Sequence, residues 1–232
     1  MAVTEATETK RWELVEGDPI APGLTALRRL GGGRRYEAYL AFNAHLHAIV
    51  VAKLVRPHLV GDGHTLAGLA SEAAMLERLQ HPVILRGFGA TVDGPRPHLV
   101  LEHLEGPRLS TLVRRHGPLP PEQLVPLALA ICSALHYLAA ERVVHLDVKP
   151  ANTIMSGPPR LIDLSVALSL DEAAALDRPI GTDGYMAPEQ CDPAALGPVG
   201  PPADVFGLGA TLYRAATGRR PFGGGDPDAE QT

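Results

Sequence analysis

The stretch His145–Asn152, "HLDVKPAN", follows the apolar pair Val143–Val144 and places an aspartate, a lysine and an asparagine within six positions. Pro150 argues against a helix interior, because proline lacks an N–H and clashes with the preceding turn. The stretch is therefore predicted to be a loop. Such a loop either hydrogen-bonds its own backbone or directs acid, base and metal-ligand groups toward one point. The rest of the chain decides between these readings.

The composition fits a globular protein with a large apolar core. The 232 residues are 45% hydrophobic, enough for one large domain or two lobes. The net charge of -5 gives no basic footprint, so nucleic acid is not an expected partner. The cysteines Cys132 and Cys191 stand in unrelated contexts, which favours reduced thiols and a cytoplasmic location. His45 and His47 lack a third ligand, so the histidines predict no metal site.

No membrane-targeting segment is expected in this chain. The N-terminal "MAVTEATETK" carries acids and lacks an apolar core region, unlike a signal peptide, and residues 1–18 are expected to form a disordered tail. The longest apolar stretch, 124–140, is interrupted by Pro126, Ser133 and His136. It is too short to span a bilayer comfortably, so a buried core helix is predicted and no transmembrane segment.

The order of predicted elements suggests two lobes. Strand-like runs surround a glycine cluster in residues 24–55, and apolar residues then recur at helical spacing from Thr65 to Gln80. Two more strand-like runs, at 83–92 and 98–104, precede a long helix at about 120–141. This order predicts a small β-rich lobe, a hinge near Glu102 to Gly106, and a helical lobe beyond it.

Two features of the first lobe are candidates for chemistry. The glycines 31–33 form either a plain hairpin turn or a turn whose bare N–H groups approach a phosphate. The Gly-Lys-Ser/Thr ending of a Walker loop is missing, which disfavours a P-loop NTPase. Lys53 ends an apolar strand, where a lysine usually reaches solvent. Glu72, however, lies beside the apolar stripe of its helix and needs a partner, and Lys53 is the candidate.

The order of the motifs along the chain is the most specific signal. A glycine turn, Lys53 and Glu72 are followed by "HLDVKPAN", "LIDLS", "GTDGYMAPEQ" and "DVFGLGATLY". This series resembles the catalytic domain of bacterial eukaryotic-like (Hanks-type) Ser/Thr protein kinases, over roughly residues 24–223. The resemblance implies an α+β fold with two lobes: a small antiparallel β lobe with one helix, residues 19–103, and a mainly helical lobe, residues 104–232, incomplete at its C-terminus.

The resemblance implies ATP and Mg²⁺ as cofactors. Lys53 would contact the α- and β-phosphates and Glu72 would orient it. The remaining nucleotide contacts implied by the resemblance are the phosphate turn at Gly31 and Gly33, adenine packing at Val51, and backbone bonds to adenine at the hinge from Glu102 to Leu104.

The same resemblance implies the roles of the opening stretch. Asp147 would orient the substrate hydroxyl and accept its proton, and Lys149 would neutralise charge on the γ-phosphate. Asn152 and Asp163 would hold Mg²⁺. The substrates would be protein Ser/Thr hydroxyls, since Lys149 and a threonine at 182 are typical of Ser/Thr kinases. Asp147, Lys149 and Asn152 are then close because phosphoryl transfer needs positioning, charge neutralisation and metal binding around one phosphorus atom.

Four residues depart from the family pattern. One is Val51, which replaces the small residue usually packed on adenine. Tyr36 stands where the third glycine of the phosphate turn usually falls. Ser165 replaces the glycine of the D-F-G motif, at a cost on the order of 1 kcal/mol if a positive φ is needed there. Leu146 replaces the arginine that usually collects a phosphate on the activation segment, so activity is expected not to depend on phosphorylation of that segment.

Two functions remain open at this point. An active kinase is expected because every group that the chemistry needs is present. A nucleotide-binding pseudokinase or kinase-like scaffold is the alternative, motivated by Tyr36, Ser165 and the end of the chain at Thr232, before the later helices of the family. In the family an arginine from those later helices pairs with the residue equivalent to Glu189, and no arginine follows Arg220 in this sequence. A further segment or a partner is therefore expected to cover the helical lobe.

Overall fold

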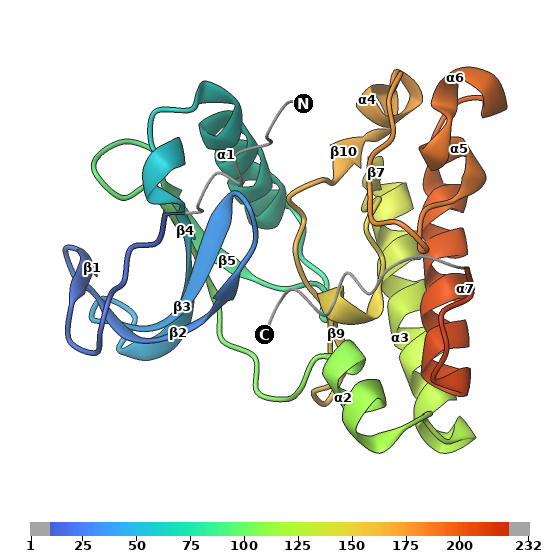
Figure 1. Ribbon diagram of the computed structural model, residues 1–232, viewed down its shortest axis with the longest axis horizontal. Helices are drawn as coiled ribbons and strands as arrows, with labels where there is room; N and C mark the ends of the chain where they lie inside the picture. Colours follow the sequence, from blue (N-terminus) through green and yellow to red (C-terminus); the bar gives the residue numbers. More distant parts are fainter. Residues whose placement is uncertain (1–9, 223–232) are drawn as a thin grey trace, which may run out of the picture. The chain divides into compact units, whose positions relative to one another are not determined.

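The computed structural model describes residues 10–222, whose helices and strands are shown in Figure 1. These residues form two compact units. The first comprises the chain up to Ala73 together with Gly87–His103, and the second comprises Ala74–Arg86 and the chain from Leu104 onward. The segment Ala74–Arg86 thus belongs to the second unit, whereas the sequence assigned it to the first lobe. Strands in one unit and helices in the other confirm the predicted α+β class.

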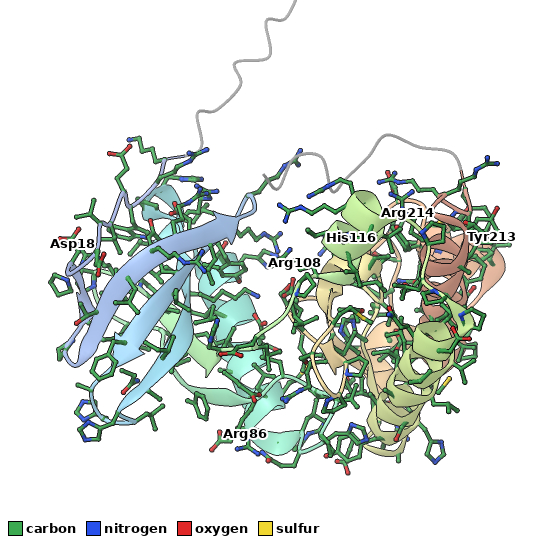
Figure 2. The ribbon with its side chains drawn as sticks, turned by 90° about the horizontal axis from the view of Figure 1, so that it is seen from below. Asp18, Arg86, Arg108, His116, Tyr213 and Arg214 are labelled. Carbon is green, nitrogen blue, oxygen red and sulfur yellow. The ribbon has the colours of Figure 1, made fainter. Side chains whose placement is uncertain are left out.

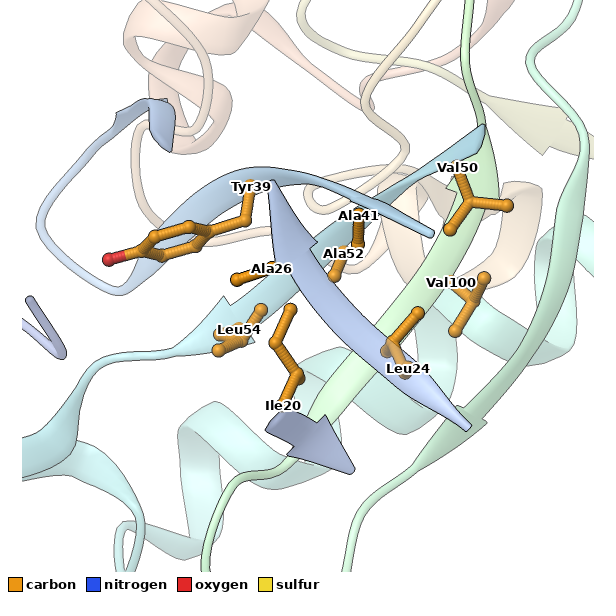
Figure 3. Close-up of a cluster of buried hydrophobic side chains, with 9 residues drawn as sticks. All are labelled: Ile20, Leu24, Ala26, Tyr39, Ala41, Val50, Ala52, Leu54 and Val100. Carbon is orange, nitrogen blue, oxygen red and sulfur yellow. The ribbon is translucent and has the colours of Figure 1, made fainter. Parts of the chain in front are cut away.

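The first unit is built on one antiparallel sheet. Its strand order is β1-β2-β3-β4-β6-β5. The strands are β1 (Pro19–Ala21), β2 (Leu24–Gly32), β3 (Tyr36–Asn43), β4 (Ala48–Val55), β5 (Gly87–Thr91) and β6 (His98–Glu102). Alternate residues of β3 and β4 are buried, as expected for strands with one face on a core. Figure 3 shows that core, which includes Tyr39, Ala41, Val50, Ala52 and Leu54.

The stretch before β1 packs against the sheet. Trp12 and Leu14 lie against the core of the first unit, and the Trp12 indole N–H donates to the carbonyl of Val55 over 2.8 Å. Of the tail expected over residues 1–18, residues 1–9 lie outside the described part. Residues 10–18 differ from the expectation, because the partly buried side chain of Trp12 holds them on the sheet.

Helix α1 (Gly63–Arg78) follows a short 3-10 turn, η1 (Pro57–Leu59). The Asp62 carboxylate accepts from the backbone N–H and the hydroxyl of Thr65, at 2.8 and 2.6 Å, and so caps the helix start. These bonds lower the pKa of Asp62 below its ordinary value. Leu69, Glu72 and Leu76 recur at helical spacing and are all buried, so the helix presents the predicted apolar stripe with a carboxylate in it.

The second unit is mainly helical. Its helices are α2 (Leu109–His116), α3 (Pro121–Ala140), α4 (Leu170–Ala174), α5 (Pro188–Cys191), α6 (Pro193–Leu196) and α7 (Pro201–Thr217). Figure 1 shows α3 and α7 side by side. Basic residues lie in the last turns of α2 and α7, where they complement the helix dipoles, and Figure 2 labels His116 and Arg214 among them.

Helix α3 lies where the sequence predicts a buried core helix, but only one side of it is buried, and Val125 and Leu129 are exposed. By length and composition it could cross a membrane, a test that the core helices of soluble proteins also pass. Its inner face, which includes Leu127, Ile131 and Leu138, is buried. This side of α3 packs on α7 and on strand β7 (Val143–Val144), so the helix serves as a core element.

Two small ribbons complete the second unit and carry the loops of interest. Strand β7 pairs with β10 (Leu168–Ser169), and β8 (Thr153–Ile154) pairs with β9 (Arg160–Leu161), both antiparallel. A 3-10 turn, η2 (Pro150–Asn152), leads into β8. The "HLDVKPAN" stretch is thus a loop between two short strands, as predicted.

Candidate active site

Lys53 and Glu72 form a bidentate ion pair in the first unit. The Nζ of Lys53, on β4, donates to both carboxylate oxygens of Glu72, on α1, at 2.9 and 2.8 Å. The two side chains are only 13% and 1% exposed. The pairing expected from the position of Glu72 is therefore confirmed, and Lys53 does not reach freely into solvent as a lysine at a strand end usually does.

Tyr36 faces this pair. It begins β3, and its ring centroid lies 4.8 Å from the Nζ of Lys53. Its hydroxyl donates to the carbonyl of Thr65 in α1 over 3.2 Å. The sequence marked Tyr36 as a departure from the glycine pattern, but it gave no sign that the ring contacts the lysine, because that contact depends on the pairing of β3 with β4.

The glycine turn contains two glycines that the geometry favours, Gly31 and Gly32, and one open one, Gly33. Gly31 has a φ of 149°, which residues with a side chain rarely adopt. A Cβ on Gly32 would lie 2.7 Å from the carbonyl oxygen of Tyr36, so packing requires glycine there. A Cβ on Gly31 or Gly33 would meet nothing within 4 Å. The turn itself is fixed, since the Nε of Arg56 donates to the Gly33 carbonyl over 2.7 Å. The two expected phosphate-binding glycines thus have open space beside them.

The residues expected around adenine lie on β4 and at the end of β6. Val51 is half-buried and pairs in register with Leu101 on β6. Glu102 ends β6, and Leu104 begins the second unit. The expected hinge therefore coincides with the passage of the chain from one unit to the other.

The loop after β7 is held by a buried carboxylate. Asp204, on α7, accepts from the backbone N–H groups of His145 and Leu146, both at 2.8 Å. Burial raises the pKa of Asp204 above its ordinary value, against these hydrogen bonds, which lower it. Asp204 is 3% exposed, and both of these bonds come from backbone N–H groups, so the buried carboxylate braces the loop.

Asp147 is the centre of a cluster of polar side chains. Its Oδ2 lies 2.9 Å from the Nζ of Lys149 and accepts from the Nδ2 of Asn152 over 2.8 Å. Its Oδ1 accepts from the hydroxyl of Thr182 over 2.6 Å, and Lys149 donates to that same hydroxyl, also over 2.6 Å. The structure therefore brings together the three residues of the opening stretch and adds Thr182.

Thr182 was named in the sequence only as a residue typical of Ser/Thr kinases and was not assigned to the site. It lies in the "GTDGYMAPEQ" motif, more than thirty residues after Asp147. The spacing of the motifs does not show that a hydroxyl bridges the aspartate and the lysine. That bridge depends on how the two loops pack.

Asn152 and Asp163 lie at the same end of the β8–β9 ribbon. Asn152 directly precedes β8, Asp163 follows β9, and the backbone N–H of Ile162 donates to the Asn152 carbonyl over 2.9 Å. Asp163 has a φ of 68°, whereas Ser165 has no positive φ, so the cost considered for Ser165 does not apply. Within residues 10–222, no cluster of three or more His, Cys, Asp or Glu side chains is arranged to hold a metal ion.

The segment after Asp163 is held by an apolar cluster and one amide. Leu146, with a φ of 64°, is 3% exposed and packs with residues such as Ala187 and Val199. The Nε2 of Gln190 donates to the carbonyls of Leu146 and Ile180, both at 2.9 Å. The place of the usual arginine is thus filled by a leucine that belongs to a core.

Comparisons with known proteins agree with this arrangement. A model of the protein kinase domain family matches residues 24–232. The serine/threonine-protein kinase PknB of Mycobacterium leprae is 33% identical over 207 residues, which cover 85% of this chain and 33% of that protein. The serine/threonine-protein kinase PkaA of Streptomyces coelicolor is 35% identical over 184 residues, covering 76% of this chain and 33% of that protein.

The chain therefore spans about a third of the length of these curated relatives. A crystal structure of a kinase domain has a TM-score of 0.81 and 20% identity, and the match covers 93% of this chain and 70% of that one. That likeness shows the two-lobed kinase fold. From the family match and its relatives, the chain belongs to the protein kinase domain family, as the order of its motifs predicts, and resembles bacterial serine/threonine-protein kinases.

Proposed function

We propose that the chain is a Ser/Thr protein kinase that transfers the γ-phosphate of Mg-ATP to a protein hydroxyl. The observation that carries this proposal is the hydroxyl of Thr182 on Asp147. An aliphatic hydroxyl already donates to Oδ1 of this carboxylate over 2.6 Å, with the Lys149 ammonium 2.6 Å from the same hydroxyl oxygen. A substrate serine or threonine needs the same two contacts, one to lose its proton and one to stabilise charge.

Asp147 would orient the substrate hydroxyl and accept its proton as the oxygen attacks the γ-phosphorus. Lys149 would offset the negative charge that develops on the transferring group. Asn152 donates to Asp147 and so fixes the direction of the carboxylate. The residues of the loop thus divide proton transfer, charge neutralisation and orientation among them.

Asn152 and Asp163 are the residues proposed to hold Mg²⁺, since an amide oxygen and a carboxylate at one end of the β8–β9 ribbon suit a hard cation. A metal held by this pair would complete its shell with phosphate oxygens and water. When bound, Mg²⁺ supplies charge neutralisation and alignment of the phosphates.

In the first unit, Lys53 is proposed to contact the α- and β-phosphates, held in place by Glu72. Gly31 and Gly33 support this role, because open space beside their α-carbons lets a phosphate approach the backbone. Val51 and the backbone from Glu102 to Leu104 are proposed to receive adenine.

The test is transfer of radiolabelled γ-phosphate from Mg-ATP to a generic protein substrate, with Asp147→Asn as the matched control. Asparagine keeps the shape of the side chain and removes the base, so transfer should fall by about 10²-fold or more. Equal rates for the two proteins would refute the assignment of Asp147.

A nucleotide-binding pseudokinase is the second candidate. The Tyr36 ring against Lys53 favours it, because a side chain already occupies one side of the ammonium that would meet the phosphates. Binding of Mg-ATP in a calorimeter without any transfer to substrate would select this reading. A protein kinase must show both binding of Mg-ATP and transfer of its γ-phosphate to the substrate.

A further inference from the structure

Tyr36 occupies a position that the strand pairing brings to Lys53. In the β3–β4 register, Lys53 is opposite Ala38, and Tyr36 lies two residues from Ala38 along β3. Residues two apart share a face of the sheet, so the tyrosine and the lysine are diagonal neighbours. An aromatic ring can reach such a neighbour, and here the ring centroid is 4.8 Å from the Nζ.

The Tyr36 ring makes a cation–π contact with the Lys53 ammonium. An ammonium within about 6 Å of a ring centroid is attracted by the negative face of the ring. Glu72 takes the same ammonium through both of its carboxylate oxygens. The Lys53 amine is therefore held by a carboxylate and also contacts an aromatic ring.

The hydroxyl of Tyr36 connects the turn to α1. It donates to the Thr65 carbonyl in the first turn of α1, and a Cβ added to Gly68, one turn later, would lie 3.4 Å from it. The tip of the side chain is thus seated on the helix.

The backbone of Tyr36 closes the glycine turn. Its carbonyl accepts from the N–H of Gly33 over 3.0 Å. Gly33 is one of the glycines with open space beside it, and its own carbonyl accepts from Arg56. Movement of Tyr36 would therefore move both the turn and the cover over Lys53.

We propose that Tyr36 is a positioning residue, which holds the Lys53 ammonium against Glu72 and latches the β2–β3 turn to α1 before any nucleotide binds. The proposal rests on the proposed function, since it assigns the tyrosine to the lysine that would contact ATP. A flexible glycine at this place leaves the turn free. Tyrosine instead positions the Lys53 ammonium before the nucleotide binds, and this should increase the affinity for the nucleotide.

The first test measures Lys53 directly, without any reaction. The chain has three lysines, Lys10, Lys53 and Lys149. Lys53 and Lys149 have the same side-chain exposure, 13%, and each is paired with a carboxylate, so Lys149 is a matched internal reference. Limited acetylation with acetic anhydride, followed by mass spectrometry, gives the ratio of labelling at the two lysines.

Tyr36→Leu removes the ring and the hydroxyl, and the Lys53/Lys149 labelling ratio should rise about threefold or more. Tyr36→Phe keeps the ring, and its ratio should stay near that of the unaltered protein. Tyr213→Leu, at a part-exposed tyrosine of α7, is the control and should change nothing. An unchanged ratio in Tyr36→Leu overturns the proposal; Tyr36→Met provides the same test if the leucine variant does not fold.

The second test separates the role of the Tyr36 hydroxyl, which ties the turn to α1, from the role of the ring, which contacts Lys53. Loss of the hydroxyl in Tyr36→Phe should raise the KM for ATP by about two- to fivefold and leave kcat unchanged, because the turn is then free to move. A fall in kcat with unchanged KM contradicts the latch. Altered labelling without any phosphate transfer would support the positioning role and reject the kinase assignment, whereas transfer with unaltered labelling would reject the positioning role alone.

Discussion

The guanidinium of Arg56 lies 3.0 Å from the carboxylate of Glu37, and the two side chains are 4% and 0% exposed. The same carboxylate accepts from the hydroxyl of Tyr39 over 3.0 Å. Because Arg56 also donates to the carbonyl of Gly33, the network joins the buried side of the sheet to the glycine turn. Arg29, which is 34% exposed, also lies 3.6 Å from this carboxylate, so Arg56 is its buried cationic partner and Arg29 its part-exposed one.

Arg56→Met should therefore destabilise the protein strongly. Removing Arg56 leaves the buried Glu37 carboxylate with Arg29, whose Nε lies 3.6 Å away on a side chain that is 34% exposed. The loss should therefore approach the value of about 3 to 5 kcal/mol that is typical of a broken buried pair. Urea denaturation followed by circular dichroism measures the loss. Arg142→Met is the matched control, because its pair with Asp171 is 64% and 87% exposed and is worth about 1 kcal/mol or less. Equal losses in the two variants would contradict the role of the network.

Tyr39 should make stability fall at high pH. Burial, with the nearby Glu37 carboxylate, raises the pKa of Tyr39 to about 12 from its ordinary value of 10.0. In the unfolded chain the phenol ionises near its ordinary value, while in the folded chain it stays protonated. The contribution is complete below about pH 10 and is lost as pH rises toward about 12, because only the unfolded state releases the proton.

Urea midpoints measured across this pH range should decline less steeply for Tyr39→Phe than for the unaltered protein. Tyr213→Phe, at an exposed phenol, should leave the slope as it is. A Tyr39→Phe slope equal to that of the unaltered protein would show that another group causes the decline.

Gly32→Ala and Gly33→Ala form a matched pair that separates packing from binding. The added methyl of Gly32→Ala would lie 2.7 Å from the Tyr36 carbonyl oxygen and should lower the melting temperature. That of Gly33→Ala meets nothing within 4 Å, so stability should hold while the KM for ATP rises severalfold. Melting curves and steady-state rates measure the two effects. A lowered KM or an unaltered one for Gly33→Ala would remove Gly33 from the nucleotide site.

Activity should not depend on phosphate carried by the activation segment. Leu146 has no charge with which to collect a phosphate, and Ser169 is already engaged as the N-cap of α4, in a capping box with Glu172. Phosphatase treatment, checked by mass spectrometry, should leave the initial rate unchanged, and Ser169→Ala should remain active. A tenfold fall, about 1.4 kcal/mol in barrier, would mean that another basic group reads a phosphate, with Arg178 the first to examine.

Much of the arrangement follows from spacing along the sequence. The Lys53–Glu72 pair was predicted because a carboxylate in an apolar helix stripe needs a partner, and the loop from Asp147 to Asn152 because proline and polar residues interrupt an apolar run. These inferences use short-range patterns, because the geometry of a helix or loop fixes where neighbouring side chains lie. The order of motifs then selects the family.

The remaining contacts depend on packing between distant parts of the chain. The bridge through Thr182, the ring of Tyr36 on Lys53 and the buried Arg56–Glu37 pair each join residues whose spacing carries no period. Trp12 illustrates the same limit. A polar N-terminal stretch predicts a disordered tail, and the sequence does not show that the Trp12 side chain packs on the sheet. Such contacts arise from tertiary structure and leave no local signature.

The leucine at position 146 also determines which solution conditions disturb the segment after Asp163. An arginine–phosphate contact weakens as salt screens the charges, whereas apolar packing such as that of Leu146 with Ala187 and Val199 is not screened. Apolar packing instead weakens on cooling, because burial of such surface is driven by entropy near room temperature. The order of this segment is therefore set by temperature more than by ionic strength, and cold is the condition that loosens it.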